Sequence, residues 1–181
     1  NAYKTNLTPF IEDSDYKDPY NILAMKYIPN NELKEKITGI SFENLNNSNK
    51  EIYKKINNSA FLDCPNGGVI GDKEIDDIFK TYKEAPELIG LFKYNENYTG
   101  TYELSISKNS GTIESISISP YFQGKGLGKL LLKSVIQKLQ QHGVDEIKLI
   151  VVSTNKKAFE LYRKYGFKED GIKSIWFTKI I

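Results

Sequence analysis

One short stretch constrains the fold of this 181-residue chain more than any other. An alternating apolar run stops at Pro120, a glycine-rich loop follows at residues 123–129, and an amphipathic helical pattern begins within its last residues. Glycines let the backbone pass close to a ligand, and the N–H groups of such a loop converge on one point. The helix adds free N-terminal N–H groups and the positive end of its dipole. The stretch therefore predicts a phosphate-binding site, formed by Gln123, Gly124, Lys125, Gly126, Leu127, Gly128 and Lys129.

The spacing of the glycines separates this loop from two common phosphate-binding patterns. A P-loop, GxxxxGK[ST], would need a glycine at position 123, where the chain has Gln123. The dinucleotide pattern GxGxxG would place its third glycine at Lys129. The pattern that fits is Q-x-x-G-x-G between a strand and a helix. Taken alone, it is also compatible with a glycine-rich turn that binds nothing.

A second segment narrows the interpretation. Residues 145–152 are typical of a buried strand, and a helical pattern over residues 156–165 follows. Together with the flanking residues this segment reads N-x-x-A-x-x-L-Y-x-x-x-G-F, from Asn155 to Phe167. The two motifs, in this order and about thirty residues apart, resemble the signature segments of the GNAT superfamily of N-acetyltransferases. The resemblance covers residues 88–181 well and residues 40–87 loosely.

The resemblance implies an α/β (α+β) fold: a mixed, mostly antiparallel twisted sheet of about six to seven strands, flanked by helices, with a V-shaped splay between the fourth and fifth strands. Hydrophobic periodicity predicts strands at residues 37–43, 88–94, 101–107, 112–119 and 145–152. A closing strand pair is expected at 166–170 and 174–181, with a turn at Asp170-Gly171. Helices are expected at 51–62, at 73–82 and after the glycine-rich loop, where an apolar stripe leaves Lys133 outside.

The chain is divided into a GNAT acetyltransferase domain at residues 37–181 and an N-terminal extension at residues 1–36. Residues 1–2, without a starting Met, are interpreted as the remnant of a tag. Residues 21–28 are apolar enough for a strand. Because Phe10-Ile11-Glu12-Asp13 resembles Phe167-Lys168-Glu169-Asp170, residues 3–30 either imitate the closing strand pair of a lost first repeat or match it by chance.

Composition limits the partners. The net charge is +2, and residues 91–181 carry the whole positive excess, which favours an anionic ligand such as CoA. The excess is modest and Arg163 is the only arginine, so nucleic-acid binding is not expected. One cysteine, Cys64, excludes a disulfide framework and favours a cytoplasmic location. No membrane segment and no metal site are expected, and the single histidine, His142, is assigned to a helix end.

The resemblance also implies the chemistry: an acetyl-CoA-dependent N-acetyltransferase of bacterial type, which transfers an acetyl group to a primary amine by direct attack in a ternary complex. Tyr162 would be the general acid, and Tyr165 would belong to the core. The alternative is a non-catalytic acyl-CoA-binding sensor or structural module. The acceptor is expected to be a small-molecule or peptide amine, and the protein a monomer or homodimer. The residues expected to bind the cofactor are Ile116, Ser117, Ile118, Gln123, Gly124, Lys125, Gly126, Leu127, Gly128, Lys129, Asn155, Ala158 and Tyr162.

A general base is harder to assign. A protonated alkylamine has a pKa of about 10, so a group in the site must take its proton directly or through water. Glu114 is the first candidate because strict alternation would place it on one face with Ile116 and Ile118. Glu103 on the neighbouring strand is the second candidate. Both are also compatible with surface carboxylates or with partners for a charged substrate.

Overall fold

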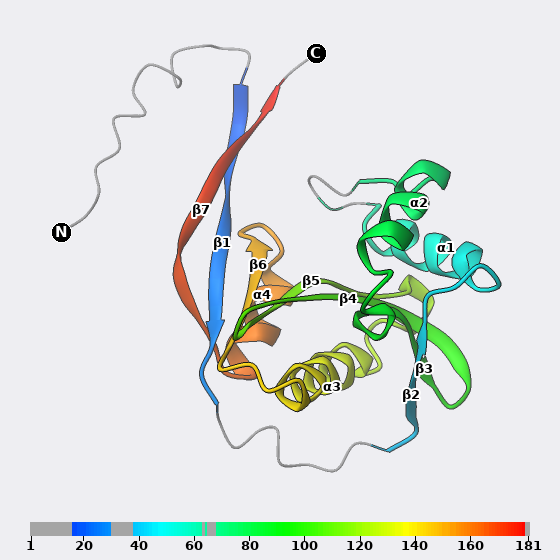
Figure 1. Cartoon of the computed structure of the whole chain (residues 1–181). Coiled ribbons are helices and arrows are strands. Elements are labelled where there is room, and N and C mark those ends of the chain that lie inside the picture. The colour runs from blue at the N-terminus through cyan, green and yellow to red at the C-terminus, as the bar shows by residue number, and fades with distance from the viewer. Residues whose placement is uncertain (1–15, 30–37, 63, 65–67, 180–181) are drawn as a thin grey trace.

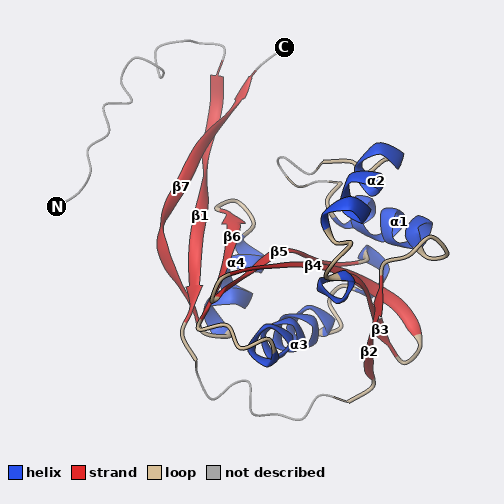
Figure 2. Cartoon of the chain, in the orientation of Figure 1, coloured by secondary structure: helices blue, strands red, loops and turns tan. Residues whose placement is uncertain are grey.

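A seven-stranded sheet and four α-helices make up the described part of the chain, which in this computed structural model is residues 16–29, 38–62, 64 and 68–179 (Figures 1 and 2). This confirms the predicted α/β class. The strands are β1 Tyr16–Tyr27, β2 Ile40–Asn44, β3 Ile89–Tyr94, β4 Asn97–Ser107, β5 Ser110–Ile118, β6 Glu146–Val152 and β7 Phe167–Lys179. The α-helices are α1 Lys50–Ala60, α2 Asp72–Thr81, α3 Leu127–Gln141 and α4 Lys156–Lys164, and short 3₁₀ turns form at Pro86–Leu88 and Pro120–Phe122.

The strands follow the order β2-β3-β4-β5-β6-β1-β7, and among these described strands only β5 and β6 run parallel. Tight turns explain the antiparallel half. Asn95 and Glu96, both with positive φ, connect β3 to β4, and Lys108, also with positive φ, lies in the turn between β4 and β5. The parallel pair needs a long crossover, which α3 provides. The predicted mixed, mostly antiparallel sheet is therefore confirmed.

Helices cover both faces of the sheet. α1 and α2 lie on one face of β4 and β5, and α3 lies across the other face (Figure 1). Tyr102 and Leu104 on β4 are fully buried on the α3 side, whereas Thr101 points toward α1, where its hydroxyl lies 3.4 Å from the side-chain oxygen of Asn57. Lys133 of α3 was predicted to face outward but is only 1% exposed, and its ammonium lies over the Tyr165 ring. Tyr165 itself is buried, as predicted.

β1 comes from the segment assigned to the N-terminal extension. It lies between β6 and β7, where Ala24 faces Ile150 on one side and Gly171 on the other. The extension therefore contributes a strand to the same sheet as residues 37–181, and the boundary at residue 36 stays a prediction. Residues 1–15 and 30–36, which include half of the proposed repeat remnant, lie outside the described residues.

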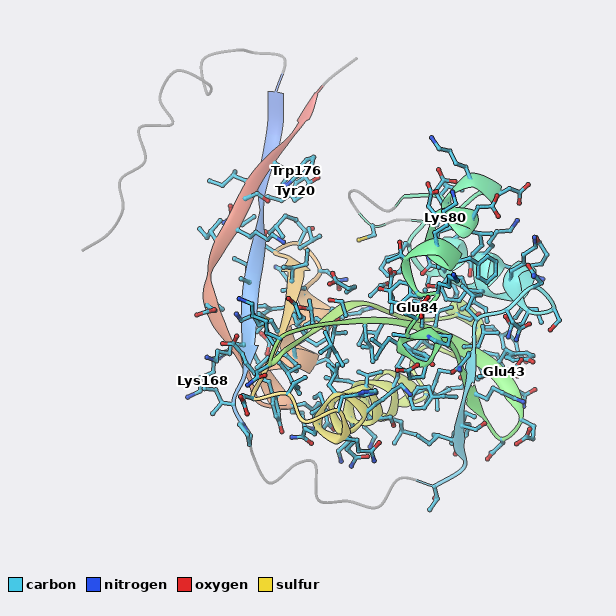
Figure 3. All side chains as sticks on the ribbon, viewed as in Figure 1. Tyr20, Glu43, Lys80, Glu84, Lys168 and Trp176 are labelled. Atoms are coloured by element: carbon cyan, nitrogen blue, oxygen red, sulfur yellow. The ribbon has the colours of Figure 1, made fainter. Side chains whose placement is uncertain are left out.

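The predicted closing strand pair is wrong. β7 is one continuous strand, paired with β1 from Tyr16 to Tyr27 (Figure 3 labels the register partners Tyr20 and Trp176). Gly171 has a φ of 113°, but it accommodates an irregularity in the β1–β7 register instead of a chain reversal. A glycine in this conformation is compatible with either role, because both a turn and a bulge need a backbone that other residues rarely adopt.

Candidate functional site

The sheet opens between its two parallel strands. β5 pairs with β6 only from residues 110–113 to residues 146–149, and beyond Ile113 and Leu149 the ladder between them ends. The rest of β5 stays attached to β4, and the rest of β6 stays attached to β1. This is the predicted V-shaped splay. It leaves the facing edges of two strands as the walls of a cleft.

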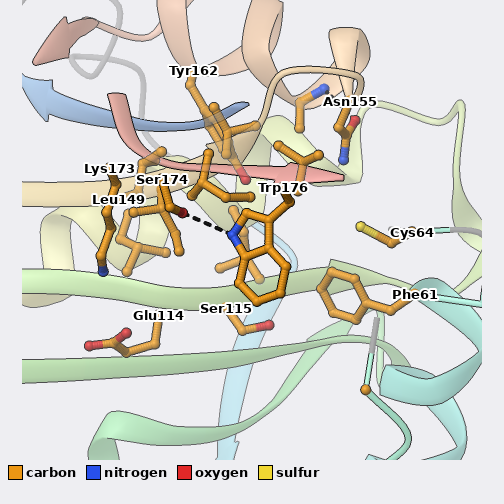
Figure 4. A pocket seen from close by; sticks show the side chains of 18 of the residues that line it. Phe61, Cys64, Glu114, Ser115, Leu149, Asn155, Tyr162, Lys173, Ser174 and Trp176 are labelled. Carbon is orange, nitrogen blue, oxygen red and sulfur yellow. Dashed lines mark hydrogen bonds between the residues drawn. The ribbon is translucent and has the colours of Figure 1, made fainter. Parts of the chain in front are cut away.

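A cavity of about 530 Å³ occupies the cleft. Its walls come from β5, β6, β1 and β7, from the start and middle of α4, and from α1 with the segment after it. Figure 4 shows Tyr162 and Asn155 entering from α4, Trp176 from β7, and Phe61 with Cys64 from the side of α1. Segments far apart in the sequence therefore meet in one space.

Glu114 lines this cavity because of an irregularity in β5. Glu103 of β4 pairs with Ser115, whereas the next residue, Leu104, pairs with Ile113. Glu114 is thus an extra residue, a β-bulge, and the alternation changes face at this point. The expectation that Glu114 shares a face with Ile116 and Ile118 is wrong for that reason. One of its carboxylate oxygens accepts a hydrogen bond from the Ser105 hydroxyl at 2.5 Å.

Glu103 is placed differently from Glu114. Its side chain is not among the described groups that line the cavity, and it accepts a hydrogen bond from the Tyr82 hydroxyl at 3.0 Å. Burial raises the pKa of Glu103; the Tyr82 hydrogen bond opposes this change and the nearby Glu114 charge adds to it. The structure therefore distinguishes the two candidate bases: Glu114 borders the cavity, and Glu103 is not among its described lining residues.

The glycine-rich loop forms as predicted. Gly124 and Gly126 adopt left-handed conformations with φ of 75° and 78°, and α3 begins at the next residue, Leu127. Within the described residues, no protein group accepts a hydrogen bond from the N–H groups of residues 124–129. A Cβ atom at Gly128 would meet only Leu161, at 3.7 Å. Packing of the protein itself therefore does not require glycine at position 128, and the loop presents free backbone donors.

The side chains of the loop have local roles as well. The Gln123 amide donates a hydrogen bond to the carbonyl of Ile118 at 2.9 Å, which attaches the loop to the end of β5. The Lys125 ammonium lies 4.7 Å from the centre of the Tyr121 ring, a cation–π contact. The glycine-rich loop does not line the cavity, but Ile116 of β5 does. The last residues of β5 therefore connect the cavity to the loop.

The second motif places three residues along α4. Asn155 caps the helix: its side-chain oxygen accepts a hydrogen bond from the backbone N–H of Ala158 at 3.1 Å. Its amide nitrogen points into the cavity in Figure 4, and Ala158 and Tyr162 also line the wall. Burial raises the pKa of Tyr162 to about 12, with a smaller contribution from Cys64. The phenol therefore keeps its proton at neutral pH.

Several lining residues were not found by sequence reasoning. Trp176, Ser174 and Lys173 come from β7. Because this segment was predicted as two strands joined by a turn, the sequence did not indicate which of its side chains face the cleft. Phe61 and Cys64 also line the cavity; the resemblance implies that residues 57–74 help to choose the substrate, but it singles out neither residue.

Two other findings concern the described residues alone. They contain no group of three or more His, Cys, Asp and Glu side chains placed to hold a metal ion. None of their helices is both long and apolar enough to cross a membrane.

Comparisons with known proteins identify a family with this fold. The model of the acetyltransferase (GNAT) family matches residues 42–167. The chain is 39% identical over 71 residues to the ribosomal protein bS18-alanine N-acetyltransferase of Haemophilus influenzae, which covers 39% of this chain and 48% of that protein. The chain spans about half the length of the curated relatives it matches.

Solved structures with the same fold have low sequence identity. A GCN5-related N-acetyltransferase from Sphaerobacter thermophilus superposes with a TM-score of 0.74 at 18% identity, covering 95% of this chain and 55% of that one. An acetyltransferase from Salmonella typhimurium, solved with acetyl-CoA, superposes with a TM-score of 0.58 at 20% identity, covering 72% of this chain and 80% of that one.

Proposed function

The chain belongs to the acetyltransferase (GNAT) family, and from this premise we propose that it transfers the acetyl group of acetyl-CoA to a primary amine by direct attack in a ternary complex. One observation carries the proposal. A strand that leads into a loop with free N–H groups also borders a cleft into which the Tyr162 phenol points. An anionic thioester carrier needs this combination: donors for its phosphates, strand edges for its amide-containing arm, and a proton donor near its sulfur.

The residues of the loop fit a diphosphate. Free N–H groups in a left-handed loop, followed by a helix N-terminus, bind anions without any side chain. Lys129 adds a positive charge beside Gly126, where its side chain would be 3.5 Å from a Cβ atom. Along β5, the edge beyond residue 113 has no partner strand on the cleft side within the described residues, so its N–H and C=O groups can pair with the amides of the carrier arm. The Asn155 amide nitrogen is the matching donor on α4.

Bound acetyl-CoA supplies the thioester carbonyl and the thiol leaving group. During transfer the nitrogen–carbon bond forms and the carbon–sulfur bond breaks, while the amine loses one proton and the thiolate gains one. We assign the amine proton to Glu114, or to water held by it, and Glu114 later returns this proton to solvent. Tyr162 donates a hydrogen bond to the departing thiolate, which takes its own proton from solvent water. Glu103 is the second candidate base; its raised pKa suits a base, but its side chain is not among the described groups that line the cavity.

Direct attack needs no nucleophilic side chain, and Cys64 is the one thiol near the reaction. Burial raises the pKa of this thiol, so little of it is thiolate at neutral pH. A covalent acetyl-enzyme on Cys64 would therefore form slowly. Two experiments test this point. The Cys64→Ala variant is expected to keep its turnover. The wild-type chain, incubated with acetyl-CoA alone, should carry no acetyl group by mass spectrometry.

The experiment that tests the proposal has two stages. Acetyl-CoA at a hundredfold its Kd is expected to raise Tm by about 5–10 °C, whereas ATP and NAD leave it unchanged. Thiol release is then followed with a panel of primary amines. Turnover of at least one amine supports the transferase. Selective stabilisation by acetyl-CoA with no turnover of any amine supports the non-catalytic sensor, and no stabilisation by acetyl-CoA refutes both.

The two candidate bases are distinguished by matched substitutions. Glu114→Gln is expected to lower kcat/KM and to change the acidic limb of the pH profile of kcat/KM, because it removes a carboxylate from the cavity wall. Glu103→Gln keeps an oxygen that accepts the Tyr82 hydrogen bond and is expected to leave the profile in place. The opposite pair of results would make Glu103 the base.

A further inference from the structure

Two bulges aim charged side chains into the same cavity. On β5 the extra residue is Glu114, as described above. On β7, Leu23 of β1 pairs with Ile172 and Ile22 pairs with Ser174, so Lys173 is the residue without a register partner. A bulge redirects a side chain that regular alternation would place elsewhere. Both extra residues line the cavity, one from each side of the splayed sheet.

Neither charge has an opposite charge as its partner among the described residues. Among the described residues that line the cavity, Glu114 and Lys173 are the charged ones. Glu114 accepts a hydrogen bond from a neutral hydroxyl, and no ion pair involves either side chain within the described part of the chain. Figure 4 shows both on the same side of the view, away from Phe61. The cavity thus presents one negative and one positive group that do not neutralise each other.

The end of the cavity that Trp176 and Phe61 border is largely apolar. Trp176 is 48% exposed, and its indole N–H donates a hydrogen bond to the Ser174 hydroxyl at 2.9 Å, which holds the ring over the cavity. Phe61 borders the same space from the end of α1. Large exposed aromatic side chains beside a cavity are typical of a binding surface.

We propose that the acceptor is a small amine that also carries a carboxylate, in the simplest case an α-amino acid with an apolar side chain. Glu114 attracts the ammonium group, Lys173 binds the carboxylate, and Trp176 and Phe61 contact the apolar side chain. This inference rests on the proposed function and adds the substrate class to it.

The charge balance of the cavity favours a zwitterion. One lysine and one glutamate together carry no net charge, so a ligand with one ammonium and one carboxylate leaves the site neutral. A diamine would place its second cation beside Lys173, which is unfavourable. A phosphate would bring about two negative charges to a single lysine that faces a carboxylate in the same cavity. A peptide N-terminus lacks the carboxylate and would leave Lys173 without a partner.

The test uses two pairs of acceptors with the full chain. L-phenylalanine is compared with phenethylamine, and L-leucine with isoamylamine; each pair shares the side chain and the amine and differs in the carboxylate. Values of kcat and KM are measured for the wild type, for Lys173→Gln and for Lys168→Gln. Lys168 is a matched control because it lies on the same strand, is exposed and does not line the cavity.

Lys173→Gln is expected to lower kcat/KM for the amino acids about tenfold, mainly through KM, and to change the values for the decarboxylated amines less than about twofold. Comparing each acceptor with itself across the variants cancels its intrinsic reactivity. Lys168→Gln should change neither class. Lys173→Glu should lower the values for the amino acids further and raise those for 1,4-diaminobutane.

Three results would overturn the inference. The first is an equal loss with both members of each pair, since a merely structural lysine would affect them alike. The second is a wild type that acetylates neither amino acid or prefers the decarboxylated amines. The third is equal use of L-phenylalaninamide and L-phenylalanine, which would point to peptide N-termini. In all three, thermal stabilisation by acetyl-CoA and thiol release with some other amine leave the proposed function standing; if acetyl-CoA neither binds nor reacts, both proposals fail.

Discussion

Replacing Tyr162 by Phe is expected to slow acetyl transfer about ten- to a hundredfold without weakening acetyl-CoA binding. The magnitude follows from the pKa of the phenol, which burial raises to about 12. A thiol has a pKa of about 8.5, so complete proton transfer from this phenol to the thiolate is uphill by about 3.5 units, or about 5 kcal/mol. The phenol can therefore stabilise the thiolate best as a hydrogen-bond donor. A hydrogen bond to a charged group contributes about 1.5–3 kcal/mol, and this range gives the expected loss.

The assay follows thiol release at saturating acetyl-CoA and measures Kd for acetyl-CoA by thermal shift. Tyr165→Phe is the matched control, since this neighbouring ring is buried in the core and does not line the cavity. Because the phenol titrates near pH 12, the wild type should show no alkaline limb from Tyr162 below pH 10. Unchanged kcat in Tyr162→Phe would refute the role of the phenol. A loss above about a thousandfold would refute the hydrogen-bond argument and favour full proton transfer.

Three further predictions concern binding and stability. Gly126→Ala places a Cβ at a φ of 78°, a strain of about 1–2 kcal/mol that the loop of the free protein can relieve by changing its conformation. Binding must then restore the strained loop, so Kd for acetyl-CoA should rise about tenfold in a titration; an unchanged Kd would contradict the assigned role of the loop. Asn155→Ala removes the oxygen that accepts the Ala158 N–H and should lower Tm by about 2–4 °C, whereas Asn155→Asp keeps this oxygen and should keep the Tm. Both variants should raise KM for acetyl-CoA, since both remove the amide donor. Burial raises the pKa of Tyr53 and Tyr162 above the value near 10 of an unfolded tyrosine. The free energy of unfolding should therefore be steady below pH 10 and fall between pH 10 and 12. Urea titrations at pH 8 and pH 11 that gave equal stability would contradict this.

The glycine-rich loop and the helices that follow the two motifs, which the sequence predicted, are set by local chemistry. The left-handed positions at Gly124 and Gly126 follow from residue type, because few other residues adopt that backbone. Asn155 caps a helix for a similar reason: its short side chain reaches the N–H group three residues later. The amphipathic pattern of α3 fixed its buried face, although Lys133 on the predicted outer side is buried beside Tyr165.

The features that were missed depend on contacts between distant segments. β1 and β7 pair across about 150 residues of sequence, and no local pattern indicates which strand fills the space beside β6. The bulges at Glu114 and Lys173 are defined by register against a neighbouring strand, and register is a property of the assembled sheet. Alternation alone therefore placed Glu114 on the wrong face, and the left-handed Gly171 was interpreted as a turn.

The bulge at Glu114 also gives a physical reason for the position of the cleft. It occurs at the residue where β5 stops pairing with β6, and an extra residue bends a strand and increases its twist. A regular strand in its place would continue alongside β6 and close the gap that lies between Ile116 and Asn155. The same irregularity thus opens the edge of β5 for a ligand and turns a carboxylate toward it. Backbone groups along that edge need hydrogen-bond partners once water is excluded, and for that reason an extended ligand rich in amides suits the cleft better than a compact one.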